Sequence, residues 1–233
     1  MHRAARVLPD PADPTAPSHA DGAVLVRGGL IAAVGPYAGL AADHPAARVR
    51  DWGDGLLAPG LRNPHGHWLL ECAYHPDPRE EIGDEPVPGG LGGLGGLGEP
   101  ADEARCGASA RRGLQRMLGF GVTAVTGPFE RASVRTAVAR SGLSVPGGPG
   151  GPGELGELGG VGGDGGHGGS GAAGIGEGPL DPLLVLPFAE AVYGRLGVGG
   201  RADFAVFEPG PDGPRAGGCR ATVLAGRLVF RRR

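Results

Sequence analysis

The stretch GAVLVRGGLIAAVG, residues 22–35, decides how the chain begins its fold. Two short apolar runs flank Gly28 and Gly29, and a glycine pair between apolar runs is typical of a tight hairpin turn. Two further short stretches, RVRDWG (48–53) and GLLAPG (55–60), have the length and apolar content of strands. The first part of the chain is therefore predicted to form a small β-sheet.

Strand patterns return only near the other end of the chain. ADFAVFEPG (202–210) alternates apolar and polar residues, and RATVLAGRLVFR (220–231) predicts a second hairpin with its turn at an Ala-Gly pair. Neither end can cover its own apolar strand faces, and such faces must be buried against another layer. We therefore expect 23–34 to pack with 203–208 and 221–230.

Between the two β-rich ends, the patterns alternate helix and strand. Residues 101–121 and 129–142 have helical apolar spacing and end in glycine, and VTAVT (122–126) is rich in β-branched residues. The fold class predicted is thus mixed α and β: a small β-sandwich from both termini, with an incomplete (β/α) barrel remnant and disordered Gly-rich loops. The boundaries that follow are a flexible leader 1–20, the composite sandwich 21–62 and 196–233, the barrel remnant 63–146, a Gly-rich linker 147–179, and a short helix within 180–195.

Glycine accumulates in two low-complexity tracts, at 88–99 and 147–179, in a chain with 50 glycines and 23 prolines. Such segments cannot bury enough apolar surface to become ordered, so we expect both to be flexible. The second tract contains GPGGPG (148–153), which has the formal spacing of a dinucleotide-binding loop. Because no strand precedes it and no helix follows, glycine richness explains the match better.

Composition excludes several classes of function. The formal net charge is -3 and there is no basic stripe, so nucleic acid is not an expected partner. The chain contains no lysine, which excludes a GxxxxGK phosphate loop, a Schiff base and a carbamylated-lysine metal bridge. No window approaches the apolar length of a membrane span. Three widely spaced cysteines without a CxxC pair suggest reduced thiols and a cytoplasmic location.

The segment APGLRNPHGHWLLE, residues 58–71, carries the strongest chemical signal. On an extended segment, side chains two residues apart point the same way, so His65 and His67 could converge on one cation. Imidazole suits zinc, iron and other divalent metals. The spacing alone is a weak motif, and two polar loop residues after a strand would look the same.

The context of this pair resembles the amidohydrolase superfamily. An apolar strand, Pro-Gly, an Asn and then His-x-His is similar to its first metal-binding strand, and LQRMLGFGVTAVTG (114–127) to the helix and strand that follow. LGVGGRADFAVFEPG and TVLAGRLVF are similar to its C-terminal segment and final hairpin. The likeness is greatest to imidazolonepropionase and aminodeoxyfutalosine deaminase, especially in their composite β-domain, and covers about 22–75, 108–142 and 196–231.

This resemblance implies a divalent metal, zinc or iron, bound by His65 and His67, with a small-molecule substrate. In the family the metal activates water to attack a carbon bonded to nitrogen in a cyclic amide, amidine or aminopurine-like compound. The family also uses histidines on later strands and a final-strand aspartate as proton shuttle. A full barrel takes about 250 residues, whereas only 137 lie between Asn63 and Arg201. His167, within the second glycine tract, is the only histidine after His75.

Local substitutes for the missing ligands are Glu71 and His75, with Asp77 nearby, and each has a simpler explanation as a core or solvated loop residue. Cys72 is better explained as a small apolar filler than as a nucleophile. Two hypotheses follow. One is a metal-dependent hydrolase of a non-peptide C–N bond; the other is a non-catalytic module with a structural or protein-interaction role. In a third, weaker reading, a second copy or a partner chain completes the barrel through unpaired strand edges.

Overall fold

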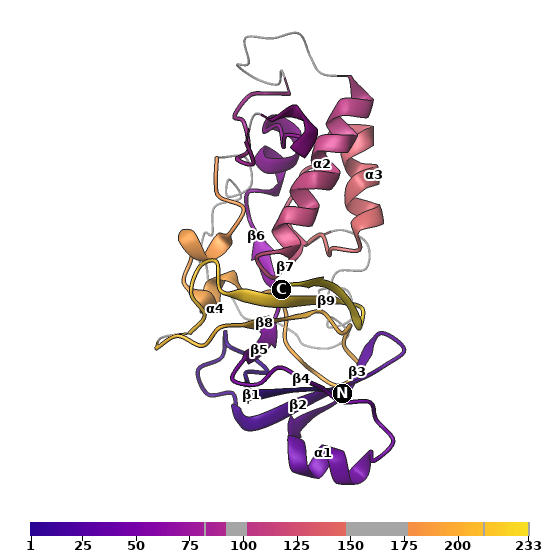
Figure 1. Ribbon diagram of the computed structural model, residues 1–233, viewed down its shortest axis with the longest axis vertical. Coiled ribbons are helices and arrows are strands. Elements are labelled where there is room, and N and C mark those ends of the chain that lie inside the picture. Colours follow the sequence, from indigo (N-terminus) through magenta and orange to yellow (C-terminus); the bar gives the residue numbers. More distant parts are fainter. Residues whose placement is uncertain (82, 92–101, 148–176, 212, 233) are drawn as a thin grey trace, which may run out of the picture. The chain divides into compact units, whose positions relative to one another are not determined.

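One eight-stranded sheet joins the two ends of the chain (Figure 1). The computed structural model describes residues 1–81, 83–91, 102–147, 177–211 and 213–232. These residues divide into two units. Unit 1 comprises Met1–Arg62, Gln115–Thr123 and Leu180–Arg233, and unit 2 comprises Asn63–Leu114 and Ala124–Pro179.

The sheet of unit 1 has the strand order β10-β9-β8-β5-β1-β2-β3, with β4 paired to β1. β5 is parallel to β1 and antiparallel to β8, where Leu56 faces Phe207 and Pro59 faces Phe204. This pair of strands is where the N-terminal and C-terminal halves meet. The strands are β1 (His2–Val7), β2 (His19–Arg27), β3 (Leu30–Pro36), β4 (Arg50–Asp51), β5 (Leu56–Pro59), β8 (Phe204–Phe207), β9 (Cys219–Leu224) and β10 (Arg227–Arg231).

The core of unit 1 draws on both halves of the chain. Val24 and Ile31 from the first hairpin lie in one buried cluster with Phe204 and Val206 of β8 and Val223 of β9. The predicted packing of the two chain ends is therefore confirmed. All eight strands belong to a single sheet, so the description as a two-layered sandwich stays a prediction.

Both predicted hairpin turns are confirmed. Gly28 and Gly29 have φ angles of 56° and 86°, and Ala225 and Gly226 have φ angles of 45° and 74°. Two consecutive positive φ angles are the requirement of the tight turn that matches the twist of a hairpin. Gly226 also needs to be glycine for space, because a Cβ there would lie 2.6 Å from Val26 Cγ1.

The predicted flexible leader, 1–20, is wrong. His2–Val7 forms strand β1, which lies between β2 and β5 in the sheet, and Val7 is fully buried. Arg3 and Arg6 interrupt the apolar pattern of this strand, and for this reason the sequence pattern does not predict a strand here. The strand is stabilised by partners that are distant in sequence: the backbone N–H of Ala5, for example, donates to the carbonyl of Gly53 at 2.9 Å.

The helical part of the chain follows the predicted order more closely. α2 (Glu103–Leu118) is followed by β7 (Val122–Val125) and then by α3 (Ala132–Ser141), which ends at Gly142 with φ 79°. β7 pairs with β6 (Leu61–Asn63) in a separate two-stranded sheet. The remaining short helices are α1 (Tyr37–Asp43), η1 (Trp68–Cys72), η2 (Pro78–Glu80), η3 (Pro182–Leu184) and α4 (Phe188–Ala191).

The short helix predicted within 180–195 is only partly present, because α4 stops at Ala191. Val192 forms a bridge with Leu61, and the N–H of Tyr193 donates to the carbonyl of Gly60. These backbone bonds to a distant segment replace those that would continue the helix. Most of both glycine tracts, including GPGGPG and His167, lies outside the described residues. Among the residues described, no helix is long and apolar enough to cross a membrane.

Candidate functional site

The histidine pair lies just beyond the end of a strand and not on it. β6 ends at Asn63, His65 lies in a turn, and His67 has helical dihedral angles of φ -57° and ψ -57°. The predicted extended geometry of the pair is therefore wrong. Pro64 has no N–H to continue a strand ladder, and the chain turns there into the π-helical segment η1.

Gly66 permits the close approach of this turn to the end of β7. A Cβ at Gly66 would lie 2.5 Å from the carbonyl oxygen of Thr126. The N–H of Thr126 in turn donates to the carbonyl of Asn63 at 3.0 Å. The glycine between the two histidines thus has a steric role, which the His-x-His spacing does not reveal.

His67 has a defined tautomer. Its side chain is 7% exposed, and its Nδ1 lies 2.7 Å from the carbonyl oxygen of Pro128. Because a carbonyl can only accept, Nδ1 carries the proton, and in the neutral ring Nε2 keeps its lone pair. Histidines that bind metals use this arrangement, in which a backbone carbonyl holds the second ring nitrogen.

His65 is half-buried and is held through its backbone. Its N–H donates to Oδ1 of Asn63 at 2.8 Å, and Nδ2 of Asn63 donates to the carbonyl of Pro179 at 3.0 Å. Gly178 lies against the imidazole ring, and a Cβ there would overlap ring atoms Cγ and Cδ2. The position of His65 therefore depends on a segment more than a hundred residues away in sequence.

Glu71, a weaker predicted ligand, is buried with 5% exposure and bound elsewhere. Its Oε1 accepts from the N–H groups of Glu130 at 2.5 Å and Arg131 at 2.9 Å. Arg131 is the N-cap residue of α3, whose first turn has no acidic residue of its own. A carboxylate at a helix N-terminus satisfies otherwise unbonded N–H groups and complements the helix dipole. Glu71 thus connects η1 to α3.

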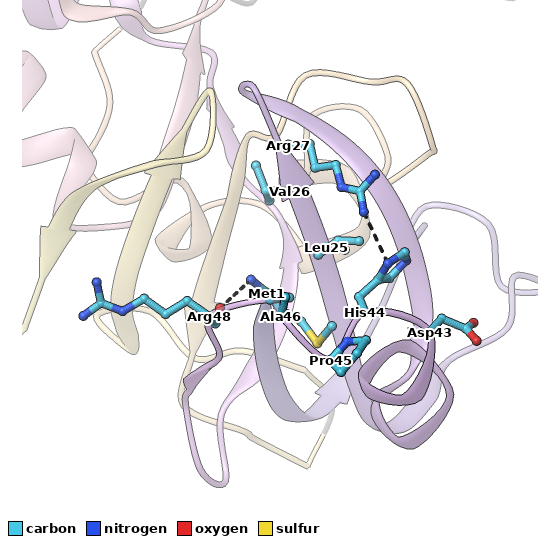
Figure 2. Close-up of a pocket in the computed structure, with 10 residues that line it drawn as sticks. Met1, Leu25, Val26, Arg27, Asp43, His44, Pro45, Ala46 and Arg48 are labelled. Atoms are coloured by element: carbon cyan, nitrogen blue, oxygen red, sulfur yellow. Dashed lines mark hydrogen bonds between the residues drawn. The ribbon is translucent and has the colours of Figure 1, made fainter.

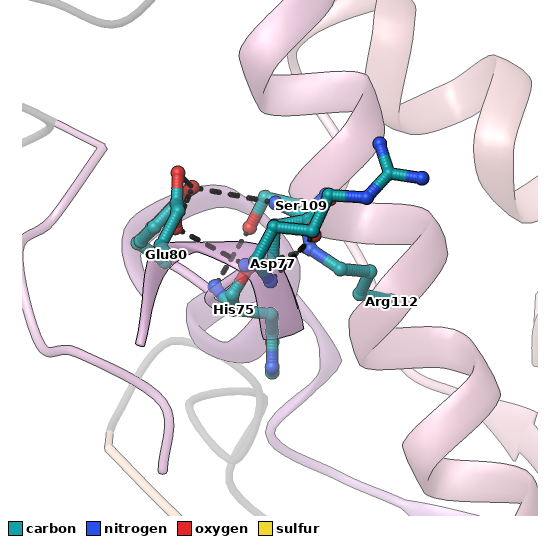
Figure 3. A network of polar contacts seen from close by, with 7 residues as sticks. His75, Asp77, Glu80, Ser109 and Arg112 are labelled. Carbon is teal, nitrogen blue, oxygen red and sulfur yellow. Dashed lines mark hydrogen bonds and ion pairs between the residues drawn. The ribbon is translucent and has the colours of Figure 1, made fainter. Parts of the chain in front are cut away.

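His75, the other weaker candidate, is fully buried, and three of its polar groups have hydrogen-bond partners. Its Nε2 lies 2.7 Å from the carbonyl of Leu69, its N–H donates to Ser109 Oγ, and its carbonyl accepts from Nε of Arg112. Figure 3 shows Ser109 and Arg112 reaching it from α2. A Cβ at Gly113 would lie 2.5 Å from Nε2 of His75. This histidine holds the segment onto α2.

The charged loop after His75 is also more ordered than its sequence suggests. Asp77 caps η2 and lies 3.6 Å from Arg112 (Figure 3). Glu80 accepts from the hydroxyl of Tyr74 at 2.6 Å. Cys72 is half-buried; burial, and secondly the Glu71 carboxylate, raise the pKa of its thiol. A raised thiol pKa disfavours a nucleophilic role.

The structure does not bring the four predicted ligands into one cluster. In the part of the chain that it describes, no three His, Cys, Asp or Glu side chains are grouped so that they could hold a metal ion. The donor chemistry of His67 fits a divalent metal, whereas Glu71 and His75 serve the fold. Pro128 and Ser109 were not predicted, since neither belongs to a motif and both act through atoms that many residues could supply.

Unit 1 contains a surface pocket of about 550 Å³ (Figure 2). Arg27 and His44 point toward one another at its rim, and a guanidinium N–H of Arg27 donates to Nδ1 of His44 at 3.3 Å. Met1 and Leu25 contribute apolar surface. None of the predicted site residues lines this pocket.

Two aspartates in unit 1, the buried Asp181 and the partly buried Asp203, have structural partners. The carboxylate of Asp181 accepts from the N–H groups of Leu183 and Gly217, and that of Asp203 accepts from the N–H of Ala225 at 2.7 Å. Burial raises the pKa of both groups. Asp203, which lies in the stretch LGVGGRADFAVFEPG, thus fixes the turn of the last hairpin.

Comparison with known proteins finds similarity over part of the chain. The family model described as "Imidazolonepropionase-like composite domain, bacteria" matches residues 22–47, which span the first hairpin and α1. The chain is 45% identical over 50 residues to imidazolonepropionase of Pyrobaculum arsenaticum, which is 22% of this chain and 13% of that protein. It is 47% identical over 47 residues to 5-methylthioadenosine/S-adenosylhomocysteine deaminase of Nitratidesulfovibrio vulgaris, which is 20% of this chain and 11% of that one.

Among solved structures, guanine deaminase from Bradyrhizobium japonicum is similar with a TM-score of 0.44 and 21% identity, over 62% of this chain and 33% of that one. The fold likeness is partial, and the sequence matches span only about an eighth of the relatives' own length. The resemblance that the motifs predict is nevertheless confirmed at the level of sequence. Residues 22–47 are similar to the imidazolonepropionase-like composite domain, and the chain is similar, over its matched residues, to imidazolonepropionase and to a 5-methylthioadenosine/S-adenosylhomocysteine deaminase.

Proposed function

We propose that this chain belongs to a metal-dependent hydrolase that cleaves a non-peptide C–N bond in a small cyclic amide or amidine. His65 and His67 would bind the metal, zinc or iron. The remaining ligands would come from a partner chain. The observation that carries the proposal is the hydrogen bond from His67 Nδ1 to the Pro128 carbonyl. It leaves the lone pair of Nε2 as a potential metal ligand.

The roles of the chain's own residues follow from their contacts. The Pro128 carbonyl fixes the tautomer of His67, and Asn63 fixes the backbone of His65. Gly66 allows both histidines to be held in one tight turn beside Thr126. A divalent metal bound there would lower the pKa of its water to about 7 and so supply hydroxide at neutral pH.

The three cysteines are free thiols, and we place the protein in the cytoplasm as part of this proposal.

The second candidate function is a non-catalytic module with a structural or interaction role. It is favoured by Glu71 and His75, whose polar atoms serve helix capping and packing. Two imidazoles alone fall short of the three protein ligands typical of a catalytic zinc site. The two candidates therefore differ in whether further ligands reach His65 and His67.

Metal binding by the purified full chain separates them. We expect one equivalent of Zn²⁺ or Fe²⁺, and a loss of affinity of at least tenfold in His65→Ala and in His67→Ala. His44→Ala, which changes a histidine on another surface, should bind as the parent protein does. A metal-free protein with an intact sheet by circular dichroism would overturn the hydrolase and favour the structural module.

Ring opening of cyclic amides and amidines, followed by mass spectrometry, and ammonia release from the exocyclic amine of aminopurines, both assayed with added metal, test the chemistry itself. Turnover that disappears in His67→Ala supports the hydrolase. Stoichiometric metal without turnover by a strict monomer in light scattering contradicts hydrolysis by the isolated chain. Turnover confined to an oligomer supports a partner chain that completes the site.

A further inference from the structure

Asn63 is fully buried at the end of β6 and connects two distant segments. Its Oδ1 accepts from the N–H of His65 at 2.8 Å, and its Nδ2 donates to the carbonyl of Pro179 at 3.0 Å. The carboxamide therefore presents an acceptor to one segment and a donor to the other. Among uncharged side chains of this size, only asparagine offers both groups in this geometry.

The segment that Asn63 holds lies directly on a predicted ligand. Gly178, which precedes Pro179, is so close to the imidazole of His65 that a Cβ would overlap Cγ and Cδ2. Nδ1 is the third nearest ring atom at 2.5 Å from that hypothetical Cβ. The backbone of residue 178 thus limits where the ring of His65 can lie.

The other histidine is held independently of this segment. His67 is oriented by Pro128, and Gly66 packs on Thr126. A disturbance at residue 178 should therefore move the ring of His65 and leave that of His67 in place. This difference distinguishes a specific positioning role from a general loss of structure.

We propose that Asn63 is a positioning residue, which seats the backbone of residues 178–179 against His65 and so fixes the orientation of that imidazole. The effect of this positioning on metal affinity rests on the proposed function, in which His65 binds the metal. Residues that orient metal ligands typically change metal affinity by 10–100-fold when they are removed. The coupling is reciprocal: a metal that binds only when the His65 ring has this orientation also stabilises residues 178–179 in their position against it.

The test uses three single substitutions in the full chain. Gly178→Ala introduces the overlap with His65. Asn63→Asp keeps the acceptor for the His65 N–H but, as a carboxylate, cannot donate to Pro179. Gly39→Ala is the matched control, because a Cβ at Gly39 meets nothing within 4 Å.

The first readout is the imidazole ¹⁵N and ¹H resonances of the metal-free protein. We expect those of His65 to shift in Gly178→Ala and in Asn63→Asp, with His67 unchanged, and neither to shift in Gly39→Ala. Unchanged His65 resonances in Gly178→Ala overturn the proposal, as does an equal shift of both histidines. Should Asn63→Asp fail to fold, Gly178→Ala still tests whether the backbone of residue 178 sets the orientation of the His65 ring.

The second readout is Zn²⁺ affinity by competition with a chromophoric chelator. We expect about a tenfold loss in Gly178→Ala and Asn63→Asp and no change in Gly39→Ala. A parent protein that binds no Zn²⁺ defeats the proposed function, whereas the resonance test still decides the role of Asn63. A parent that binds Zn²⁺ with the same affinity as both variants overturns the positioning role alone.

Discussion

The sheet of unit 1 and the segment 63–75 of unit 2 differ in how many polar residues they bury. The core of the sheet is apolar, from Val7 and Leu57 to Phe204, and its contacts are shared among many strands. The segment 63–75 buries apolar residues such as Leu69 and Leu70, but it also buries the polar residues Asn63, His67, Glu71 and His75. Each of these four residues has a hydrogen bond to a backbone group.

This difference teaches how each region responds to change. Apolar burial has no direction, so the sheet responds mainly to the area and volume that are lost. A buried polar group loses its partner altogether when one atom is changed, and the partner is then left unbonded. The sheet should therefore tolerate conservative substitutions that the segment 63–75 does not.

The largest effect should come from removing an aromatic ring from the sheet core. Phe204 is fully buried in β8, beside the junction of the two chain halves. Phe204→Ala leaves a cavity and should destabilise unit 1 by about 3–5 kcal/mol. Urea unfolding followed by circular dichroism measures the change. Val229→Ala, on β10 with 42% exposure, should change stability by less than about 0.5 kcal/mol, and equal effects would show that the ends do not share a core.

The next effect concerns a polar group inside that apolar core region. Burial, followed by the chain's amino group and Arg50, lowers the pKa of His2 to about 4. Trp52 Nε1 donates to its Nδ1 at 3.3 Å. The unfolded chain takes up a proton near pH 6.5 and the folded one only near pH 4, so protonation favours unfolding between these values.

Stability should therefore fall as the pH drops from about 6.5 to about 4, by roughly 3 kcal/mol in total from this residue. Urea unfolding at several pH values measures it, and His2→Phe keeps an aromatic ring without the titration. The parent should lose more stability than His2→Phe across this window. Parallel pH profiles of the two proteins would show that His2 is not buried as a neutral ring.

The smallest of the three effects tests the polar segment. Glu71→Gln keeps an oxygen for the N–H groups of Glu130 and Arg131 but removes the charge that strengthens these bonds. We expect a loss of about 1–2 kcal/mol, with faster hydrogen exchange at those two amides. Glu85→Gln, at an exposed site of unit 2, is the control. Unchanged exchange at both amides in Glu71→Gln would contradict the capping role.

Local patterns were sufficient to predict the two hairpins, α3 and the meeting of the chain ends. Alternation and turn glycines depend on neighbours in sequence, and the apolar faces of the two β-rich ends have no other means of burial. Strand β1 escaped prediction because Arg3 and Arg6 interrupt its pattern, and α4 is short because residues 192–193 bond to a distant strand.

For the candidate site, the residue types could be predicted but not their geometry. The order of Pro-Gly, Asn63 and the two histidines indicated the family. It did not indicate that His67 has helical dihedral angles or that Glu71 caps α3. Those features depend on residues near 130, which the motif does not contain.

The sequence by itself determined which donors lie at residues 65 and 67 and which strands have apolar faces, because both follow from residue identity and spacing. Tertiary structure alone decided which ring nitrogen of His67 carries its proton and where the ring of His65 lies. The carbonyl of Pro128 and the backbone of Gly178 set these two features. A hydrogen bond or a close contact has a direction only once its distant partner has been folded into place.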